Sequence, residues 1–585
     1  NKTFIPFMNT NAPKRLPYGN ANFKSIRTEN NSIYVDKTRF IELLEKENNS
    51  SRIFIRPRRF GKSLFLSTLS YYYDINYANE FEQLFGDLYI GQNPTPLKNS
   101  YAVMEFDFSS IDTANVERFQ NSFFQNLRST VCRFLSKYKD IFPNTEQVVD
   151  QINNLEYPAL AALDWSFRIA ESAKMKVFVI IDEYDHFAND LIAIGSVLGD
   201  DFYKKMITAN GLVRDFYEKL KIMAKYGIVA QTFITGISPI MLDDLTSGYN
   251  ISSNLSLDSQ YNEMLGFTQK EVNKLMEAIG IKSDQIDIDM VHYYNGYLFN
   301  EEGENKVYNP SMILYVFDQL LKTGKSPKNL IDPNLSIDPK RLKRLVQNES
   351  NRNILIQIIK DGNIVSNVLE KFSIDRLNDN VYFISLLFYM GLLTIKESCL
   401  DELRLVIPNY SIQTTFWAYL REFVQDYSPD IVLDIRELKE SIRLIAMEGN
   451  IHNFIDYVSQ HAFSKLSDHD LQHFDEKYIK VLLFAYLILH SFYIPMSEFE
   501  TVPGRADIFL QRNPKFPQVK YEWIWELKYC KTDAKETEIA QKRKEGLEQL
   551  NQYLHSARLK DRPNLKSALL IFIGKDKYEI VENTN

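Results

Sequence analysis

The chain has 585 residues, too many for one hydrophobic core, so we expect two to four domains. Its formal net charge of −8 excludes an overall basic surface, so any contact with nucleic acid must be local. Three widely spaced cysteines (Cys132, Cys399 and Cys530) argue against a disulfide framework or a cysteine-rich zinc site.

The apolar stretches are too short for a membrane span. The longest, residues 383–395 and 481–489, fall below the roughly 18–20 residues that a spanning helix needs. The start of the chain lacks the charged-then-apolar layout of a signal peptide. We therefore expect a cytoplasmic protein with no membrane partner.

Short apolar runs alternate with amphipathic segments over about the first 260 residues. This alternation is typical of a parallel α/β sheet whose strands are buried on both faces. The runs that we predict as strands are residues 52–55, 102–106, 177–181 and 231–234.

The first of these strands is followed by Arg-Pro-Arg-Arg-Phe-Gly-Lys-Ser at residues 56–63. A P-loop, or Walker A motif, has Gly, four residues, then Gly-Lys-Ser/Thr; here Arg56 stands at the first glycine position. Gly61 would let the backbone approach phosphates, Lys62 would reach the β- and γ-phosphates, and Ser63 would ligate Mg²⁺. The alternative is a basic turn on a solvated surface.

The third predicted strand ends in Asp182 and Glu183, as a Walker B motif requires. We expect Asp182 to hold Mg²⁺ and Glu183 to polarise the attacking water. Acidic residues at a strand end also cap helices, which is the structural alternative. The two motifs in this order, each after a strand, favour ATP binding.

Further phosphate-site candidates flank these motifs. Arg58 and Arg59 would neutralise phosphate charge. Thr235 follows the fourth predicted strand and could sense the γ-phosphate, although a simple strand-ending turn explains it equally well.

Thr268 could cap a helix with Glu271 three residues later. Residues 323–340, with three prolines among polar residues, form the best linker candidate. We predict a mainly helical region over about 341–440, with the apolar run at 383–395 buried.

From about residue 441 the pattern predicts an α-β-β-α-β order. Its elements are a helix near 471–491, strands at 505–510 and 523–529, a helix near 533–556, and a strand at 568–573.

Asp507 and the Glu526-Leu527-Lys528 segment lie on the two strands of the predicted pair. Alternation along a strand places Glu526 and Lys528 on one face, and the pairing can bring Asp507 to them. Two carboxylates can bind Mg²⁺ or Mn²⁺ while a lysine orients water, as phosphodiester hydrolysis requires. A cross-strand salt bridge on a wet face is the common alternative.

Several segments resemble the AAA-ATPase-like family, which is usually fused to a C-terminal PD-(D/E)XK nuclease-like domain. The segments are residues 34–38, 56–63, 181–185, 235–239, 294–297 and 308–310. Arg-Pro-Arg-Arg-Phe-Gly-Lys-Ser is specific to this family, whereas Tyr-Asn-Gly-Tyr departs from the usual Tyr-Asp-Gly-Tyr. The resemblance implies an ATPase-plus-nuclease architecture.

The resemblance also suggests accessory residues in the C-terminal region. Gln549 and Tyr553, which share one helix face, look like the Gln-x-x-x-Tyr motif of RecB-like nucleases. An upstream helical acid is expected in this superfamily; Glu476 is our candidate metal ligand, with Glu498 and Glu500 as competitors. Basic residues that could meet a phosphate-rich partner are Lys528, Lys531, Lys535, Lys542, Arg543 and Lys544, with a second run at residues 340–344.

We predict a multidomain α/β protein. Its parts would be a P-loop ATPase domain (1–265), a helical lid or winged-helix-like subdomain (266–325), a helical linker domain (326–440) and a C-terminal restriction-endonuclease-like domain (441–585). The first hypothesis is an enzyme in which ATP binding or hydrolysis controls a metal-dependent nuclease with catalytic residues Asp507, Glu526 and Lys528. Its cofactors would be ATP and Mg²⁺ or Mn²⁺, and its partner DNA or RNA.

Two other interpretations stay open. The chain could be a nucleotide-controlled switch whose nuclease-like domain binds nucleic acid or protein without cleaving. It could also be a scaffold in which both sites have decayed. The sequence does not decide whether it forms a homo-oligomer.

Overall fold

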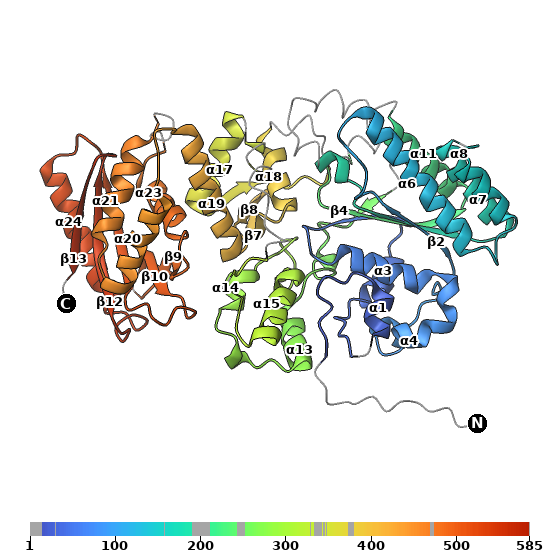
Figure 1. Cartoon of the computed structure of the whole chain (residues 1–585), viewed down its shortest axis with the longest axis horizontal. Helices are drawn as coiled ribbons and strands as arrows, with labels where there is room; N and C mark the ends of the chain where they lie inside the picture. Colours follow the sequence, from blue (N-terminus) through green and yellow to red (C-terminus); the bar gives the residue numbers. More distant parts are fainter. Residues whose placement is uncertain are drawn as a thin grey trace. The chain divides into compact units, whose positions relative to one another are not determined.

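The protein consists of two compact units (Figure 1). One comprises Asn1–Ile354 and Ile364–Asn409, the other Leu355–Asn363 and Tyr410–Asn585. The four-part division expected from the sequence stays a prediction. The computed structural model describes residues 14–29, 31–156, 158–189, 211–240, 242, 252–327, 329–332, 342, 345–346, 348–371, 379–467, 473–502 and 504–583.

A five-stranded sheet forms the centre of the N-terminal unit, with strand order β2-β3-β4-β1-β5 and parallel pairing throughout. The four strands predicted from apolar runs are confirmed, because these runs are buried between two helical layers. The strands are β1 (Ser51–Ile55), β2 (Ala102–Asp107), β3 (Val177–Asp182), β4 (Val229–Gly236) and β5 (Ser253–Asn254).

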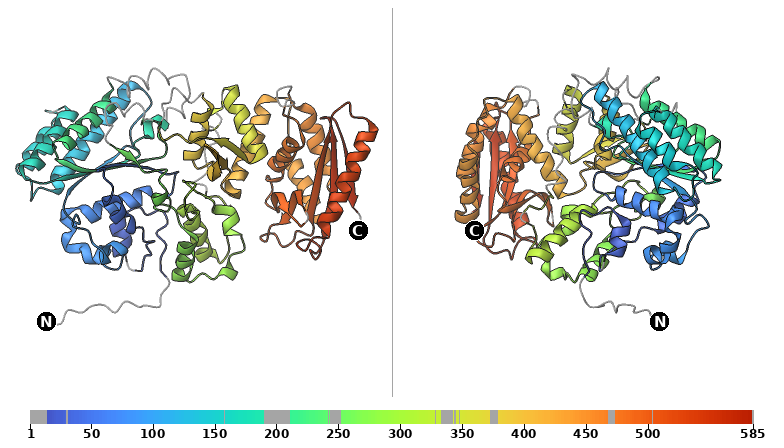
Figure 2. Two further views of the ribbon diagram at one scale, coloured as in Figure 1. Left: turned by 180° about the vertical axis from the view of Figure 1, so that it is seen from behind. Right: turned by 45° about the vertical axis from the view of Figure 1, so that its right-hand side comes forward.

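Helices cover both faces of this sheet (Figures 1 and 2). On one face lie α6 (Val116–Lys137), α7 (Thr145–Asn153), α8 (Ala159–Ser172) and α11 (Leu212–Lys225). On the other face lie α1 (Phe23–Thr28), α3 (Lys62–Tyr73) and α4 (Phe81–Phe85). The same part of the sequence also holds two short helices, α2 (Arg39–Glu45) and α5 (Tyr89–Gln92).

Three helices follow the sheet: α13 (Gln269–Ile279), α14 (Met290–Tyr294) and α15 (Pro310–Thr323). The predicted cap is confirmed, since the Thr268 side chain accepts from the Glu271 N–H and the Glu271 side chain from the Thr268 N–H. The predicted linker starts where α15 ends, and most of its second half lies outside the described residues.

The prediction of a mainly helical region over 341–440 is confirmed, and the region also holds a small sheet that was not predicted. Besides α17 (Glu349–Asp361) and α18 (Asn380–Tyr389), this region holds a sheet of order β6-β8-β7. Its strands are β6 (Asn363–Ser366), β7 (Thr394–Cys399) and β8 (Glu402–Val406). The apolar run at 383–395 is divided by Gly391, whose φ of 78° ends the helix before β7 begins.

The C-terminal unit is built on a second five-stranded sheet, of order β13-β12-β11-β10-β9. Two of its strands, β9 and β13, were not in the α-β-β-α-β order predicted from the sequence. The elements are α19 (Tyr410–Tyr427), α20 (Ile435–Glu448), α21 (His452–His461), α23 (Glu476–Leu487), β9 (Tyr493–Glu500), β10 (Arg505–Arg512), β11 (Glu522–Cys530), α24 (Glu536–Leu554), β12 (Leu565–Ile573) and β13 (Lys577–Asn583).

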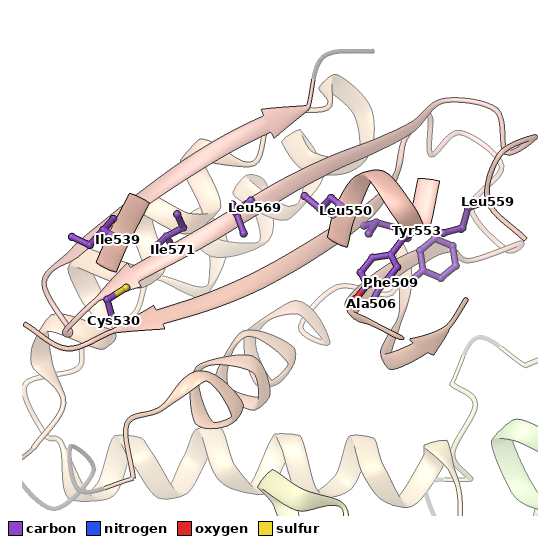
Figure 3. Packing of buried hydrophobic residues seen from close by; sticks show 10 residues of the cluster. Ala506, Phe509, Cys530, Ile539, Leu550, Tyr553, Leu559, Leu569 and Ile571 are labelled. Carbon is purple, nitrogen blue, oxygen red and sulfur yellow. The ribbon is translucent and has the colours of Figure 1, made fainter. Parts of the chain in front are cut away.

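Different helices pack on the two faces of this sheet. α24 closes one face through an apolar cluster that includes Phe509, Leu550 and Leu569 (Figure 3). On the other face Trp523 donates to the carbonyl oxygen of Ile445 in α20 at 3.3 Å. The sheet is therefore fixed on both sides, with β10 and β11 in its interior.

Among the residues described above, no helix combines the length and the apolar character that a bilayer span requires.

Candidate functional site

The loop between β1 and α3 has the backbone of a phosphate-binding turn. Gly61 caps α3 at φ 95°, in the left-handed region that glycine adopts without steric penalty. Arg59 also has a positive φ, 65°. Residues 61–65 line the cavity described below. The first N–H groups of a helix have no partner within the helix, so this end of α3 is a favourable place for an anion.

Arg56, at the first glycine position of the motif, is a structural residue. Its side chain is buried and donates from Nη1 to the carbonyl oxygen of Ser256 at 2.7 Å and from Nη2 to that of Tyr261 at 3.0 Å. The guanidinium lies over the rings of Phe54 and Phe299, at 4.1 and 3.9 Å from their centroids. Arg56 thus anchors the loop and does not line the cavity.

Lys62 and Ser63 lie where the sequence predicts them. The Lys62 ammonium donates to the carbonyl oxygens of Arg56 and Pro57, both at 3.0 Å, and burial lowers its pKa. Ser63 Oγ donates to Asp182 Oδ2 at 2.7 Å, and burial raises the pKa of Asp182. The serine and the aspartate predicted to hold Mg²⁺ are therefore in direct contact.

Glu183 follows Asp182 with a strained backbone, at φ 52°. It lines the same cavity as Lys62. Burial raises the pKa of Glu183 to about 7, opposed by the nearby Lys62 charge. A carboxylate with this pKa can exchange a proton with water near neutral pH, as the predicted role demands.

Thr235 does not take the position expected from the sequence. Its buried hydroxyl donates to the carbonyl oxygen of Phe54 at 2.6 Å and so joins β4 to β1. The residue is not among those that line the cavity. The acceptor of this hydroxyl lies on the adjacent strand β1, far from Thr235 in sequence.

Asp185 was not singled out from the sequence, yet it connects the ends of β3 and β4. Its fully buried carboxylate accepts from the Ile237 N–H at 3.1 Å and from the Ser238 N–H and hydroxyl at 2.7 and 2.9 Å. A Cβ at Gly236 would lie 2.2 Å from this carboxylate. The bonds fix the two strand ends beside Glu183.

A cavity of about 470 Å³ adjoins the P-loop, within the range of ligand pockets. Exposed Arg58 and Arg59 lie at its rim together with Gly61, Lys62 and Ser63. Apolar side chains also line the cavity: Ile33, Val35, Leu265, Phe267 and Leu275. The lining therefore combines basic groups that suit phosphates with apolar groups that suit a flat ring.

Residues near 294–297 and 308–310 contact the P-loop through hydrogen bonds and ring packing. Asn309 Nδ2 donates to the Arg58 carbonyl oxygen and Ser311 Oγ to that of Arg59, both at 3.2 Å. The Phe60 ring meets Tyr297 edge to face, with centroids 5.0 Å apart.

The second candidate site lies on β10 and β11. These strands pair antiparallel with Ile508 opposite Trp525, so one further step puts Asp507 opposite Glu526 on the other face. Asp507 Oδ2 accepts from the Leu527 N–H at 2.9 Å, and Lys528 Nζ donates to Glu526 Oε1 at 2.7 Å. The three predicted residues are thus brought together.

Burial dominates the electrostatics here. It raises the pKa of Glu526 to about 7, with help from the Asp507 charge, and it raises that of Asp507. Burial alone would lower the pKa of Lys528, but the hydrogen bond to Glu526 raises it above its usual range. Two buried acids that resist ionising side by side are typical of a cation site.

The donor set fits a single divalent cation. Glu526 is 2% exposed, and no described residue forms a hydrogen bond to its Oε2. Within the described ranges no three His, Cys, Asp or Glu side chains gather as a metal-ligand group. Mg²⁺ is commonly held by one or two carboxylates with water filling the other positions, which Asp507 and Glu526 match.

Three further predicted residues lie near this pair without a hydrogen bond to it: Glu476, Gln549 and Tyr553. Burial raises the pKa of Glu476 while the Lys528 charge lowers it, so the two are neighbours, but Glu476 completes no three-ligand group. Burial, aided by Glu526, raises the pKa of Tyr553 to about 12. No described residue forms a hydrogen bond to the buried Gln549 Oε1.

Lys480 was not predicted from the sequence, and Glu498 was predicted only as an alternative to Glu476. Lys480 lies on α23 with 6% of its surface exposed, bonds to Glu498, and is 4.0 Å from Asp507 Oδ1. A lysine inside the apolar run of α23 was the available signal.

Two of the basic residues near the site already have partners within the protein. Lys542 donates to the Tyr529 carbonyl oxygen at 2.5 Å, and Arg543 pairs with Glu579 at 2.7 Å. The second predicted basic run, Lys340, Arg341, Lys343 and Arg344, lies outside the described residues.

Two family matches cover separate parts of the chain. Residues 17–246 match the family described as "Predicted AAA-ATPase", and residues 474–582 match the "PD-(D/E)XK nuclease superfamily". A curated relative, "Uncharacterized protein in vnfD 5'region" of Azotobacter chroococcum mcd 1, is 27% identical over 310 residues. This match covers 52% of either chain, so the chain spans about half the length of that relative.

Among solved structures the chain is similar to the ORC2 protein of Aeropyrum pernix (ADPNP-ADP complexes), at 12% identity and a TM-score of 0.32. That match covers 66% of this chain and 92% of the other. It is also similar to Cdc6p of Pyrobaculum aerophilum, at 9% identity and a TM-score of 0.24, covering 70% and 96%. At such scores the fold class rests on the two sheets of the chain itself.

Proposed function

Because the chain carries an AAA-ATPase-like domain over residues 17–246 and a PD-(D/E)XK nuclease superfamily domain over residues 474–582, we propose that nucleotide binding or hydrolysis controls a metal-dependent nuclease. The observation that carries the proposal is the pairing of acids with their motif partners at both sites. Ser63 contacts Asp182 at 2.7 Å, and Asp507, which accepts from the Leu527 N–H, is on the same face of β10 and β11 as Glu526.

In the N-terminal site Lys62 and the amides at the start of α3 bind the triphosphate, with Arg58 and Arg59 at its edge. Ser63 and Asp182 hold Mg²⁺, which neutralises phosphate charge. Glu183 accepts a proton from the attacking water.

In the C-terminal site Asp507 and Glu526 hold a divalent cation, which offsets the negative charge that builds up on a phosphodiester. Lys528 is held protonated by Glu526 and therefore binds a phosphate oxygen or orients water; it does not accept a proton. Gln549 and Tyr553 lie on the adjoining helix and help to position the strand that is cut. The substrate is DNA or RNA.

The coupling has a physical route inside the N-terminal unit. Tyr297 packs on Phe60 of the P-loop and shares a hydrogen bond with Asn409. Asn409 also donates from Nδ2 to the Asn295 carbonyl oxygen at 3.0 Å and is the last residue before the chain enters the C-terminal unit for the second time, at Tyr410. A shift of the P-loop therefore reaches the connection through packed groups.

Two measurements on the full chain test the activities separately. We expect labelled ATP with Mg²⁺ to bind the wild type and to be lost from Lys62→Ala. We expect cleavage of DNA or RNA with Mg²⁺ or Mn²⁺ to vanish in Asp507→Ala and Lys528→Ala. Equal cleavage by those two variants and the wild type would remove the nuclease assignment.

One observation favours a non-cleaving switch as the second candidate. The acids of the C-terminal site already have lysine partners, Glu526 with Lys528 and Glu498 with Lys480. In that case nucleic acid or protein would bind in a nucleotide-dependent manner, with no cleavage under any metal condition.

A further inference from the structure

Lys480 is a buried lysine that the proposed catalytic set does not use. It lies one helical turn after Glu476 on α23 (Figure 1). The residues of this helix from 478 to 487 are all buried. Only 6% of its surface is exposed. A buried ammonium persists only when carboxylates pair with it, so its surroundings define what it does.

Two carboxylates face this ammonium from two different strands. Glu498 on β9 forms an ion pair with it, and Asp507 Oδ1 on β10 lies 4.0 Å away. The other oxygen of Asp507, Oδ2, accepts from the Leu527 N–H at 2.9 Å. Lys480 therefore lies on the side of Asp507 that the backbone of β11 leaves open.

Paired metal ions in phosphodiester-cleaving sites are about 3.5–4 Å apart and stabilise the attacking and the leaving oxygen together. If one ion lies between Asp507 and Glu526, a second ion that also binds Asp507 would need the space that the Lys480 ammonium occupies. It would also need the negative charge that this ammonium already neutralises. Glu498, the acid that could complete such a second position, is bonded to the same lysine.

We propose that the Lys480 ammonium stands in for a second metal ion, so that the Asp507–Glu526 site binds one divalent cation per chain. This inference rests on the proposed function only in that it needs the first cation. The lysine supplies a fixed positive charge next to Asp507 that does not depend on the metal concentration.

Counting Mn²⁺ ions by calorimetry and by the loss of the free-ion EPR signal tests this proposal on the full chain without nucleotide. Ions bound elsewhere are measured on an Asp507→Asn/Glu526→Gln protein and subtracted. We expect one ion for the wild type and for Lys480→Arg, which keeps the charge. Lys480→Met should bind two, with an EPR spectrum of two coupled ions, and Lys480→Met/Glu498→Gln should return to one.

The outcomes separate this inference from the function on which it rests. No Mn²⁺ at the wild-type site would remove the metal-dependent nuclease and this inference together. One ion in the wild type and still one in folded Lys480→Met would overturn this inference alone. Two ions in the wild type would do the same while leaving the nuclease in place.

Discussion

At the scale of single residues, Arg56 shows how a P-loop can form without its first glycine. The carbonyl oxygen of Arg56 accepts from Lys62 at 3.0 Å while its guanidinium is bonded to Ser256 and Tyr261. The arginine side chain that replaces glycine is buried in the protein, and the backbone carbonyl of the same residue still accepts a hydrogen bond from Lys62. The missing glycine is therefore no sign of a decayed site.

Replacing Arg56 by Gly restores the standard motif but should damage the protein. The carbonyl oxygens that it serves would lose charged donors, and a cavity would open between two aromatic rings. We expect the free energy of unfolding of the N-terminal unit to fall by about 3 kcal/mol, with weaker ATP binding. Denaturant unfolding measures this; the exposed Arg58→Gly is the stability control, and a more stable Arg56→Gly protein would contradict the structural role.

The pKa of Glu526 predicts how metal binding depends on pH. The carboxylate must lose its proton to bind a cation, and burial raises its pKa to about 7. The metal-competent form is thus dominant above pH 7 and falls as pH drops below it. We expect Mn²⁺ affinity at this site to be about tenfold weaker at pH 6 than at pH 8. Glu526→Gln should bind more weakly without this pH dependence; a flat wild-type profile would refute the assignment.

At the scale of elements, sequence patterns predicted the strands that are buried on both faces and missed those that are not. Each of β1 to β4 contains a run of buried apolar residues, although β2 also carries the exposed Glu105. β9, by contrast, contains Pro495 and several polar residues and lies at the edge of its sheet. The run at 383–395 could not be divided from the pattern alone, since a short apolar run suits a helix or a strand. Gly391 was the local signal.

α24 owes its position to the apolar face that it lays on β11 and β12. Leu550 is fully buried in the cluster of Figure 3. Leu550→Ala should lower the free energy of unfolding of the C-terminal unit by about 2–5 kcal/mol, by loss of buried area and the cavity left behind. Gln552→Ala, on the exposed side of α24, should change it by less than about 0.5 kcal/mol. Equal effects of the two would place α24 elsewhere.

The candidate sites follow the same division. Lys62, Ser63, Asp182 and the Asp507–Glu526–Lys528 set could be predicted because each stands at a fixed spacing next to a strand. Thr235, Asp185 and Lys480 could not, because their partners come from strands or helices distant in sequence. Lone polar residues acquire their roles only when the sheet is assembled.

At the scale of the whole molecule, a glycine and an asparagine lie at one of the points where the chain passes between the units, residues 409–410. Gly296 has φ 115°, and a Cβ there would lie 2.0 Å from the Pro408 carbonyl oxygen. Beside it Asn409 bonds to the Asn295 carbonyl oxygen. The segment that packs on the P-loop thus also fixes the residues that enter the C-terminal unit.

Asn409→Ala should separate the two activities. With the bonds to Asn295 and Tyr297 lost, a P-loop movement would no longer reach residue 410. We expect ATP affinity within about twofold of wild type, since the binding residues are untouched, and loss of the effect of ATP on cleavage. Asn305→Ala, an exposed asparagine away from this contact, is the control. An unchanged ATP effect in Asn409→Ala would exclude this route.

The central claim is that one chain joins a nucleotide site to a metal-dependent nuclease site. The most direct test is the rate of Mn²⁺-dependent cleavage of labelled DNA and RNA with and without ATP, for the wild type, Lys62→Ala and Asp507→Asn. The account predicts that ATP changes the wild-type rate, that Lys62→Ala cleaves at a rate indifferent to ATP, and that Asp507→Asn does not cleave. Cleavage by Asp507→Asn at the wild-type rate, or an equal response of Lys62→Ala to ATP, would contradict it.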